Sequence, residues 1–187
     1  MKEAQHERVK WVKTFLDSKD SLLEIGCSSG YFIEFIRGFV SEAKGLEMNE
    51  EEASYGRSIG LSITTGGLED VSRKFNHVCL FQVLEHQNDP IEFLDKLSKD
   101  LLCSGGKLHI EVPTLDNPLI SLYLIPEFRD FWFQEPHLFY FSHSSLRRIL
   151  ESLGFKVVFS TTRQTTGLIN HLSWMLTGKP MSQRQAA

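Results

Sequence analysis

Residues 22–32 of the chain read LLEIGCSSGYF, and this stretch decides the fold class. The residues before Gly26 are apolar except Glu24, which is typical of a strand that is covered on both faces. Gly26 and Gly30 allow a sharp turn, and apolar residues recur at helical spacing after it. The stretch therefore predicts a strand, a glycine-rich turn and a helix whose first N–H groups face a carboxylate or phosphate.

Strand-like and helical patterns alternate on either side of this turn. Asn49 and Glu52 have the form of a capping box, which predicts that a helix begins there. Another helix is expected from Pro90 until Gly105 and Gly106 stop it. The expected strands are 21–25, 43–47, 61–65, 77–83 and 107–112. Because parallel neighbours require crossover helices, this order predicts an α/β fold, a doubly wound and mainly parallel sheet with helices on both faces.

The pattern changes after residue 113. Residues 115–136 are irregular and aromatic, Ser142 is placed to cap a helix over 144–153, and 155–161 is expected to be a strand. Apolar residues at helical spacing favour a helix over 171–177, while a further antiparallel strand there stays open. No internal repeat or second domain is evident, so 1–187 is expected to be one domain.

Composition narrows the class of protein. The 187 residues are 41% hydrophobic and 24% charged, as in one ordinary globular domain. A net charge of −4 offers no basic surface for nucleic acid or for an anionic membrane. The three cysteines lack the paired spacings of a disulfide framework or zinc site, so reduced thiols are expected. The N-terminus is charged and lacks the apolar core of a signal peptide, which predicts a cytoplasmic protein.

Taken alone, the glycine turn is ambiguous. A dinucleotide-binding turn has glycine at three places, whereas Ser28 and Tyr31 occupy the second and third of them here. Nicotinamide or flavin binding is therefore disfavoured. An ordinary α/β turn without a ligand remains the alternative for Gly26 and Gly30.

Five blocks of sequence, in order, resemble class I S-adenosylmethionine (AdoMet)-dependent methyltransferases. The first is Glu24-x-Gly26 with Gly30, in which Ser28 replaces the central glycine of the family motif. The others are Gly45-Leu46-Glu47, 75–86 ending in Leu-Glu-His, 104–113, and 137–155, which begins HLFYFS. The last block resembles a subgroup that acts mostly on small molecules.

The resemblance implies AdoMet as cofactor and S-adenosylhomocysteine as product, bound by a cofactor core over 1–113. In the family, the acidic residue at the second strand end, here Glu47, accepts hydrogen bonds from the ribose hydroxyls. No metal is expected, because carboxylates and histidines show no recognisable ligand spacing. The implied cofactor-binding residues are Glu24, Gly26, Cys27, Ser28, Gly30, Tyr31, Glu47, Met48, Gly67, Leu68, Phe81 and Gln82.

Two departures from the family pattern and two alternatives accompany this assignment. The family commonly has Asp after the third strand to hold the adenine amino group, whereas residues 66–69 read GGLE, so that contact is missing or passes to Glu69. Asn76 also stands where the family usually carries Asp. Glu47 has the alternative of an ordinary surface residue, and Glu85 with His86 the alternative of capping and orienting their loop.

The acceptor side is expected in an aromatic segment, 114–142, which is followed by a C-terminal helix and strand region, 143–187. Its seven aromatic residues within 128–141 suit a substrate wall or, alternatively, core packing. His137 is the candidate general base, Glu135 its orienting partner and His143 the reserve. A purely structural role for His137 stays open.

The predicted function is methyl transfer to a small-molecule acceptor. The Glu135/His137 pair resembles the Glu-His before the same block in sugar C-methyltransferases, which suggests a sugar or a secondary metabolite. No nucleic acid or membrane partner is expected, and monomer and homodimer are both open. The alternative function is a non-catalytic AdoMet-binding or scaffolding protein that kept the fold.

Overall fold

The computed structural model describes residues 2–163 and 167–181 of the chain. The chain divides into two compact units, Met1–Glu111 and Val112–Ala187. The first unit contains every strand of the described residues, and the second unit is helical where it has regular structure. In the described part of the chain, no helix is long and apolar enough to cross a membrane.

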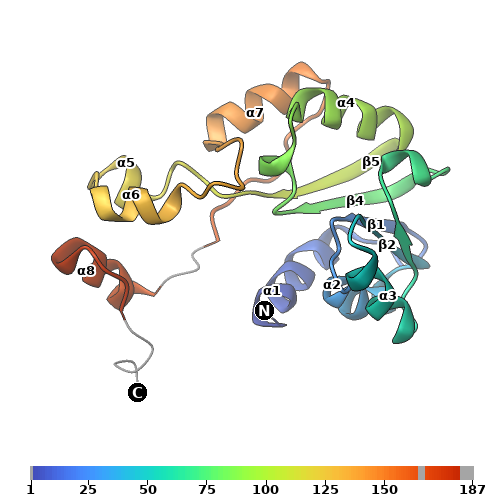
Figure 1. The fold of residues 1–187 in the computed structure, drawn as a ribbon. Coiled ribbons are helices and arrows are strands. Elements are labelled where there is room, and N and C mark those ends of the chain that lie inside the picture. The colour runs from blue at the N-terminus through green and yellow to red at the C-terminus, as the bar shows by residue number, and fades with distance from the viewer. Residues whose placement is uncertain (1, 164–166, 182–187) are drawn as a thin grey trace. The chain divides into compact units, whose positions relative to one another are not determined.

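A five-stranded parallel sheet forms the centre of the first unit (Figure 1). The strand order is β3-β2-β1-β4-β5, so the first strand lies in the middle and all five of its residues are buried. This arrangement confirms the predicted doubly wound α/β fold. The strands are β1 (Ser21–Ile25), β2 (Glu42–Glu47), β3 (Ile63–Thr65), β4 (Phe75–Phe81) and β5 (Leu102–Glu111).

Helices cover both faces of this sheet (Figure 1). One face packs against α1 (Lys2–Val12), α2 (Tyr31–Ile36) and α3 (Glu50–Ser58), and the other lies under α4 (Pro90–Asp100). Short 3-10 turns lie at Lys13–Phe15, Arg37–Phe39, Leu68–Asp70 and Leu84–His86. The main core is formed by apolar side chains from the three helices and the strands, among them Val12, Phe32, Ile36, Leu22 and Cys79.

The second unit has its own small core. Its helices are α5 (Pro118–Ser121), α6 (Pro126–Trp132), α7 (His143–Ser152) and α8 (Leu168–Thr177). The ring of Phe128 packs edge-on against Trp174 with centroids 5.1 Å apart and stacks on Trp132 at 5.5 Å. Trp174 thus fixes α8 onto α6, and the helix expected over 171–177 is confirmed.

Three expectations about local structure are wrong. Residues 155–161 form no strand, and Val158 within them is 70% exposed. A strand needs a neighbouring strand to satisfy its backbone hydrogen bonds, and this segment pairs with none in the described part of the chain. Residues 115–136 are not irregular throughout, since Pro118 and Pro126 each begin a short helix. Gly105 and Gly106 do not stop α4, which ends at Asp100, but lie inside β5.

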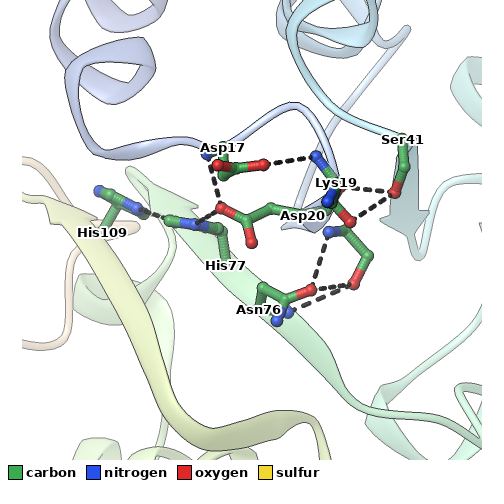
Figure 2. A network of polar contacts seen from close by, with 8 residues as sticks. Asp17, Lys19, Asp20, Ser41, Asn76, His77 and His109 are labelled. Carbon is green, nitrogen blue, oxygen red and sulfur yellow. Dashed lines mark hydrogen bonds and ion pairs between the residues drawn. The ribbon is translucent and has the colours of Figure 1, made fainter.

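Polar side chains gather at the amino ends of β1 and β4, in the first unit (Figure 2). The Asn76 side-chain oxygen accepts hydrogen bonds from the backbone N–H and the hydroxyl of Ser21, at 2.9 and 3.0 Å. The Asn76 N–H donates in return to the Ser21 hydroxyl at 3.3 Å. Asn76, the departure from the family pattern, therefore clamps the two strands together.

Two buried histidines extend this network. His77 Nε2 lies 3.0 Å from the carboxylate of Asp20, and His77 Nδ1 lies 2.9 Å from His109 Nε2 (Figure 2). Burial lowers the pKa of His77, and it lowers the pKa of His109 to about 3, which favours the neutral form of both rings. A neutral His77 that donates to the Asp20 carboxylate through Nε2 accepts through Nδ1 from His109 Nε2.

Candidate functional site

The glycine-rich turn follows β1 directly and needs both of its glycines. Gly26 has φ +69° and Gly30 has φ +83°, in the left-handed region that glycine adopts without strain. A Cβ atom on Gly26 would lie 2.6 Å from Val83 Cγ2, and one on Gly30 would lie 2.6 Å from Leu61 Cδ1. Gly30 is also the N-cap of α2, whose first residue is Tyr31. No other residue type fits both positions.

Ser28 takes the place of the family's central glycine and adopts a left-handed conformation. Its φ is +49°, which costs a non-glycine residue about 1 kcal/mol or more. Two contacts stabilise it: the backbone N–H donates to Glu47 Oε2 at 2.8 Å, and the hydroxyl donates to Glu52 Oε2 at 3.1 Å. The substitution of serine for glycine is therefore compensated by carboxylates that follow β2.

Glu47 ends β2 and joins two loops. Besides the N–H of Ser28, its carboxylate accepts the N–H of Asn49 through Oε1 at 2.9 Å. Asn49 caps α3 as predicted, since its side chain accepts from the N–H groups of Glu51 and Glu52. The other half of the predicted capping box is wrong, because the Asn49 N–H is taken by Glu47 and the Glu52 carboxylate binds Ser28.

Glu24 is a buried carboxyl directly below the turn. It is 3% exposed, and its Oε2 has no hydrogen-bond partner among the described residues. Burial raises the pKa of Glu24 well above its ordinary value, while the charge of Arg8 lowers it and that of Glu47 raises it. Burial also raises the pKa of the neighbouring Cys27 thiol, so Cys27 is a packed, unreactive side chain.

The loop after β3 approaches the same strand end. The Gly66 N–H donates to the backbone oxygen of Glu47 at 2.9 Å, and the Gly67 N–H donates to the Asp70 carboxylate at 2.9 Å. Leu68 follows, half-buried, at the start of a 3-10 turn. Glu69, the substitute considered for the missing family Asp, is exposed and lies 3.8 Å from Lys96 of α4.

The end of β4 supplies an aromatic ring and a second left-handed residue. Phe81 is buried and packs edge-on against Phe32 with ring centroids 4.9 Å apart. Gln82 follows with φ +61°, and its N–H donates to the backbone oxygen of Glu111 at 2.8 Å. Glu85 is fully buried, both of its carboxyl oxygens lack a partner among the described residues, and burial raises its pKa.

The predicted cofactor-binding residues all lie in the first unit, at the carboxyl ends of neighbouring strands. Strand pairing fixes their faces: Glu24 pairs with Gly45 and with Cys79, so Glu47 and Phe81, two residues further on, share its face of the sheet. Met48, next to Glu47, is 83% exposed. The structure thus brings the glycine turn, the acidic strand end and the post-β4 turn to one edge of the sheet.

The candidate base lies in the second unit. His137 Nδ1 is 3.0 Å from the hydroxyl of Tyr140, which also donates to the backbone oxygen of Trp132 at 3.0 Å and accepts from the N–H of Gln134 at 2.7 Å. With the single hydroxyl proton directed to Trp132, His137 donates through Nδ1, so Tyr140 fixes the orientation of the ring.

The two other acceptor-side residues differ from expectation in their surroundings. Glu135 is exposed, and the side chain that contacts His137 Nδ1 is Tyr140. His143, the reserve base, has both ring nitrogens engaged, with Ser160 Oγ at 2.7 Å and Thr162 Oγ1 at 2.9 Å. His143 is thus held by side chains of the segment that follows α7.

The sequence analysis did not identify three residues that contact the candidate site residues. One is Tyr140, which lies in the aromatic segment three residues after His137, and this spacing is the only signal of their contact. Arg8 and Glu111 gave no signal, because they are 103 residues apart and form an ion pair with a 2.6 Å contact.

A family model described as a methyltransferase domain matches residues 2–159. Among curated proteins, the chain is similar to a tRNA U34 carboxymethyltransferase from Alteromonas mediterranea, with 27% identity over 176 residues. That match covers 83% of this chain and 51% of the relative, so the chain spans about half of the relative's length.

Solved structures share the fold. A SAM-dependent methyltransferase from Archaeoglobus fulgidus superposes with a TM-score of 0.67 at 22% identity, covering 83% of this chain and 70% of the other. The magnesium protoporphyrin IX methyltransferase from Synechocystis PCC 6803, solved with bound SAH, gives 0.69 at 14% identity, covering 88% and 77%.

Proposed function

Because the chain belongs to the methyltransferase domain family, we propose that it transfers the methyl group of AdoMet to a small-molecule acceptor. The observation that carries the proposal is the Glu47 carboxylate at the end of β2, held against the glycine turn by the N–H of Ser28. When bound, AdoMet supplies a methyl group on a positively charged sulfur. The protein's own residues then have to bind AdoMet, orient the acceptor and take up a proton from it.

The residues at the sheet edge suit the parts of AdoMet. Each oxygen of Glu47 accepts one backbone N–H, from Ser28 or Asn49, and keeps lone pairs for a pair of ribose hydroxyls. Glu47 places a carboxylate at this edge, which favours a cationic ligand. A dinucleotide pyrophosphate would meet this carboxylate as well as the Ser28 side chain.

His137 is the proposed proton acceptor. Methyl transfer needs the acceptor aligned and, where its nucleophile carries a proton, a neutral base to remove it. The hydrogen bond of His137 Nδ1 to Tyr140 supports this role, since it holds the ring in one orientation. Glu135, exposed two residues before it, is proposed to favour the protonated ring electrostatically.

The charge and composition of the chain support a small-molecule acceptor. A tRNA acceptor, as in the Alteromonas relative, would require basic surface for phosphates, whereas this chain has a net charge of −4. The aromatic segment 128–141 suits a ring or a sugar. A non-catalytic AdoMet-binding protein is the second candidate.

Calorimetry followed by an acceptor screen tests the proposal. We expect AdoMet and S-adenosylhomocysteine to bind and NAD not to bind. Mass spectrometry of a small-molecule library incubated with AdoMet should then show products heavier by one methylene, and a structured tRNA pool should show none. Absence of nucleoside binding would overturn the assignment of the site, and binding without any product would favour the non-catalytic protein.

A further inference from the structure

Arg8 of α1 makes a two-pronged ion pair with the last residue of β5. Its Nη2 lies 2.6 Å from Glu111 Oε1, and its Nε lies 3.3 Å from Glu111 Oε2. The two side chains are only 11% and 16% exposed, so water screens this pair much less than the surface ion pairs of the chain. Planar contacts of this kind fix direction as well as distance, which a lysine cannot do.

The same guanidinium covers the end of the neighbouring strand. Arg8 Cζ lies 4.7 Å from the ring centroid of Phe81, the last residue of β4. Phe81 and Glu111 are partners in the β4–β5 register, so one side chain from α1 holds the carboxyl ends of both strands. The stacking adds attraction, because the ring face is electron-rich.

Glu111 in turn holds the turn that leaves β4. The Gln82 N–H donates to the backbone oxygen of Glu111 at 2.8 Å, and the Gln82 side-chain nitrogen lies 3.4 Å from Glu111 Oε1. Gln82 is left-handed at φ +61°, a conformation that a non-glycine residue keeps only when its surroundings hold it. The direction in which the chain continues toward Glu85 therefore depends on Glu111.

We infer that Arg8 is a positioning residue for AdoMet binding: through Glu111 and Phe81 it fixes the left-handed turn at Gln82 that the cofactor contacts. The inference rests on the proposed function, because it takes the post-β4 turn as part of the cofactor site. Arg8 itself need not touch the cofactor. Its charge also opposes the effect of burial on Glu24 and Glu85, whose pKa values burial raises and Arg8 lowers.

The chain provides a control of the same residue types at the other end of β4. Arg73 Nη1 lies 2.6 Å from Glu42 Oε2, and Arg73 Cζ lies 4.7 Å from the ring centroid of Phe75. This ion pair is more exposed than that of Arg8, at 45% and 33%, and it lies at the amino ends of β2 and β4, away from the Gln82 turn. Arg73→Gln thus removes an arginine–carboxylate–phenylalanine contact without touching the proposed cofactor edge.

The test compares Arg8→Gln, Arg8→Lys and Arg73→Gln. S-adenosylhomocysteine affinity is measured by calorimetry, unfolding by urea, and hydrogen exchange over 82–86 in the ligand-free protein. We expect Arg8→Gln to weaken S-adenosylhomocysteine binding by about tenfold and to speed exchange over 82–86. Arg8→Lys should rescue little of either effect, and Arg73→Gln should lower the urea midpoint alone.

A double variant separates the inferred route from a general loss of stability. Combining Arg8→Gln with Glu111→Gln should weaken binding no more than the stronger single change, since both break one contact chain. Equal affinity and equal exchange in Arg8→Gln and Arg73→Gln would overturn the positioning role. A third outcome would be faster exchange over 82–86 in Arg8→Gln together with no binding of S-adenosylhomocysteine by the parent protein. That outcome would contradict the proposed function but would leave the Arg8 contacts with Glu111 and Phe81 supported.

Discussion

The carboxylate of Glu47 holds the backbone N–H of Ser28 at 2.8 Å, which ties the end of β2 to the glycine turn after β1. Ser28 is left-handed, so this hydrogen bond stabilises a conformation that serine otherwise avoids. The hydrogen bond therefore fixes the shape of the turn that is proposed to bind the cofactor. Glu47 is expected to act twice, as a partner of the ribose hydroxyls and as a support for the turn.

Glu47→Ala should therefore weaken S-adenosylhomocysteine binding by about 1–3 kcal/mol, the usual range for a hydrogen bond to a charged group. Loss of the Ser28 contact should also lower the free energy of unfolding. Calorimetry and urea unfolding measure the two effects separately. Glu51→Ala, an exposed change at the second residue of α3, is the control. Equal affinity in Glu47→Ala and parent would remove Glu47 from the site.

Glu24→Gln should stabilise the protein at neutral and alkaline pH. Burial raises the pKa of Glu24, so the folded carboxyl stays protonated while the unfolded one ionises above its ordinary pKa of 4.5. Stability is therefore lost as pH rises above that value, and glutamine abolishes this loss. Urea unfolding at pH 5 and pH 8 should show a gain that is larger at pH 8.

The matched control for Glu24 is Glu34→Gln, which changes an exposed carboxyl of α2. Its effect on the free energy of unfolding should be smaller than that of Glu24→Gln at both pH values. A stabilisation by Glu24→Gln that shrinks from pH 5 to pH 8 would contradict the raised pKa.

His109→Gln should flatten the acid side of the stability curve. The folded pKa of His109 is lowered from 6.5 to about 3 by burial and by the charges of His77 and Lys107, so only the unfolded ring gains a proton between these values. Stability therefore falls as pH falls, by up to about 1.4 kcal/mol per pH unit for each such histidine. The lowered pKa of Asp20 adds loss in the same direction below pH 3.8.

Glutamine at position 109 retains an N–H donor for His77 Nδ1 and has no titration. Unfolding midpoints measured from pH 7.5 to 4.5 should therefore decline less steeply than in the parent. A His109→Gln curve parallel to the parent's over this range would show that His109 is not held neutral.

His137→Ala should leave S-adenosylhomocysteine affinity nearly unchanged and lower turnover by about 10²–10⁴, the usual contribution of a positioned base. Tyr140→Phe removes the hydroxyl that contacts His137 Nδ1, Trp132 and Gln134, so it should lower both the rate and the thermal stability. Initial rates at saturating AdoMet and thermal melting measure these effects.

His143→Ala is the comparison for the base assignment, because both of its ring nitrogens already have partners. We expect it to affect stability more than turnover. Unchanged turnover in folded His137→Ala would make His137 structural, and a selective loss in His143→Ala would move the base to the reserve position.

Local chemistry determined which parts of the fold could be predicted. β1 and β4 are nearly continuous apolar runs, Asn49 caps α3 with its own side chain, and Pro90 begins α4, so each is readable from a few adjacent residues. The strand expected over 155–161 failed for the opposite reason. Its residue types suit a strand, but pairing depends on a neighbour that no local pattern specifies.

The same distinction applies to the candidate site. The glycine positions and Glu47 follow from a turn and a strand end, which the sequence displays directly. The partners of Ser28 depend on how β1 and α3 pack, and the capping-box residue Glu52 was therefore assigned to the wrong N–H. Arg8 contacts Glu111 only when α1 packs onto the sheet, so no local sequence pattern around either residue predicts the contact.

The clamp of hydrogen bonds between Ser21 and Asn76 favours one register between the central strands β1 and β4. A slip of β1 by one position against β4 would move Glu24 to the opposite face and shift the height at which Gly26 and Gln82 leave the sheet. The clamp would lose its three hydrogen bonds together in such a slip, so the shifted pairing is penalised at once. The contacts at the amino ends of β1 and β4 thus fix the register of the two strands. That register places the turns at Gly26 and Gln82 side by side at the carboxyl ends.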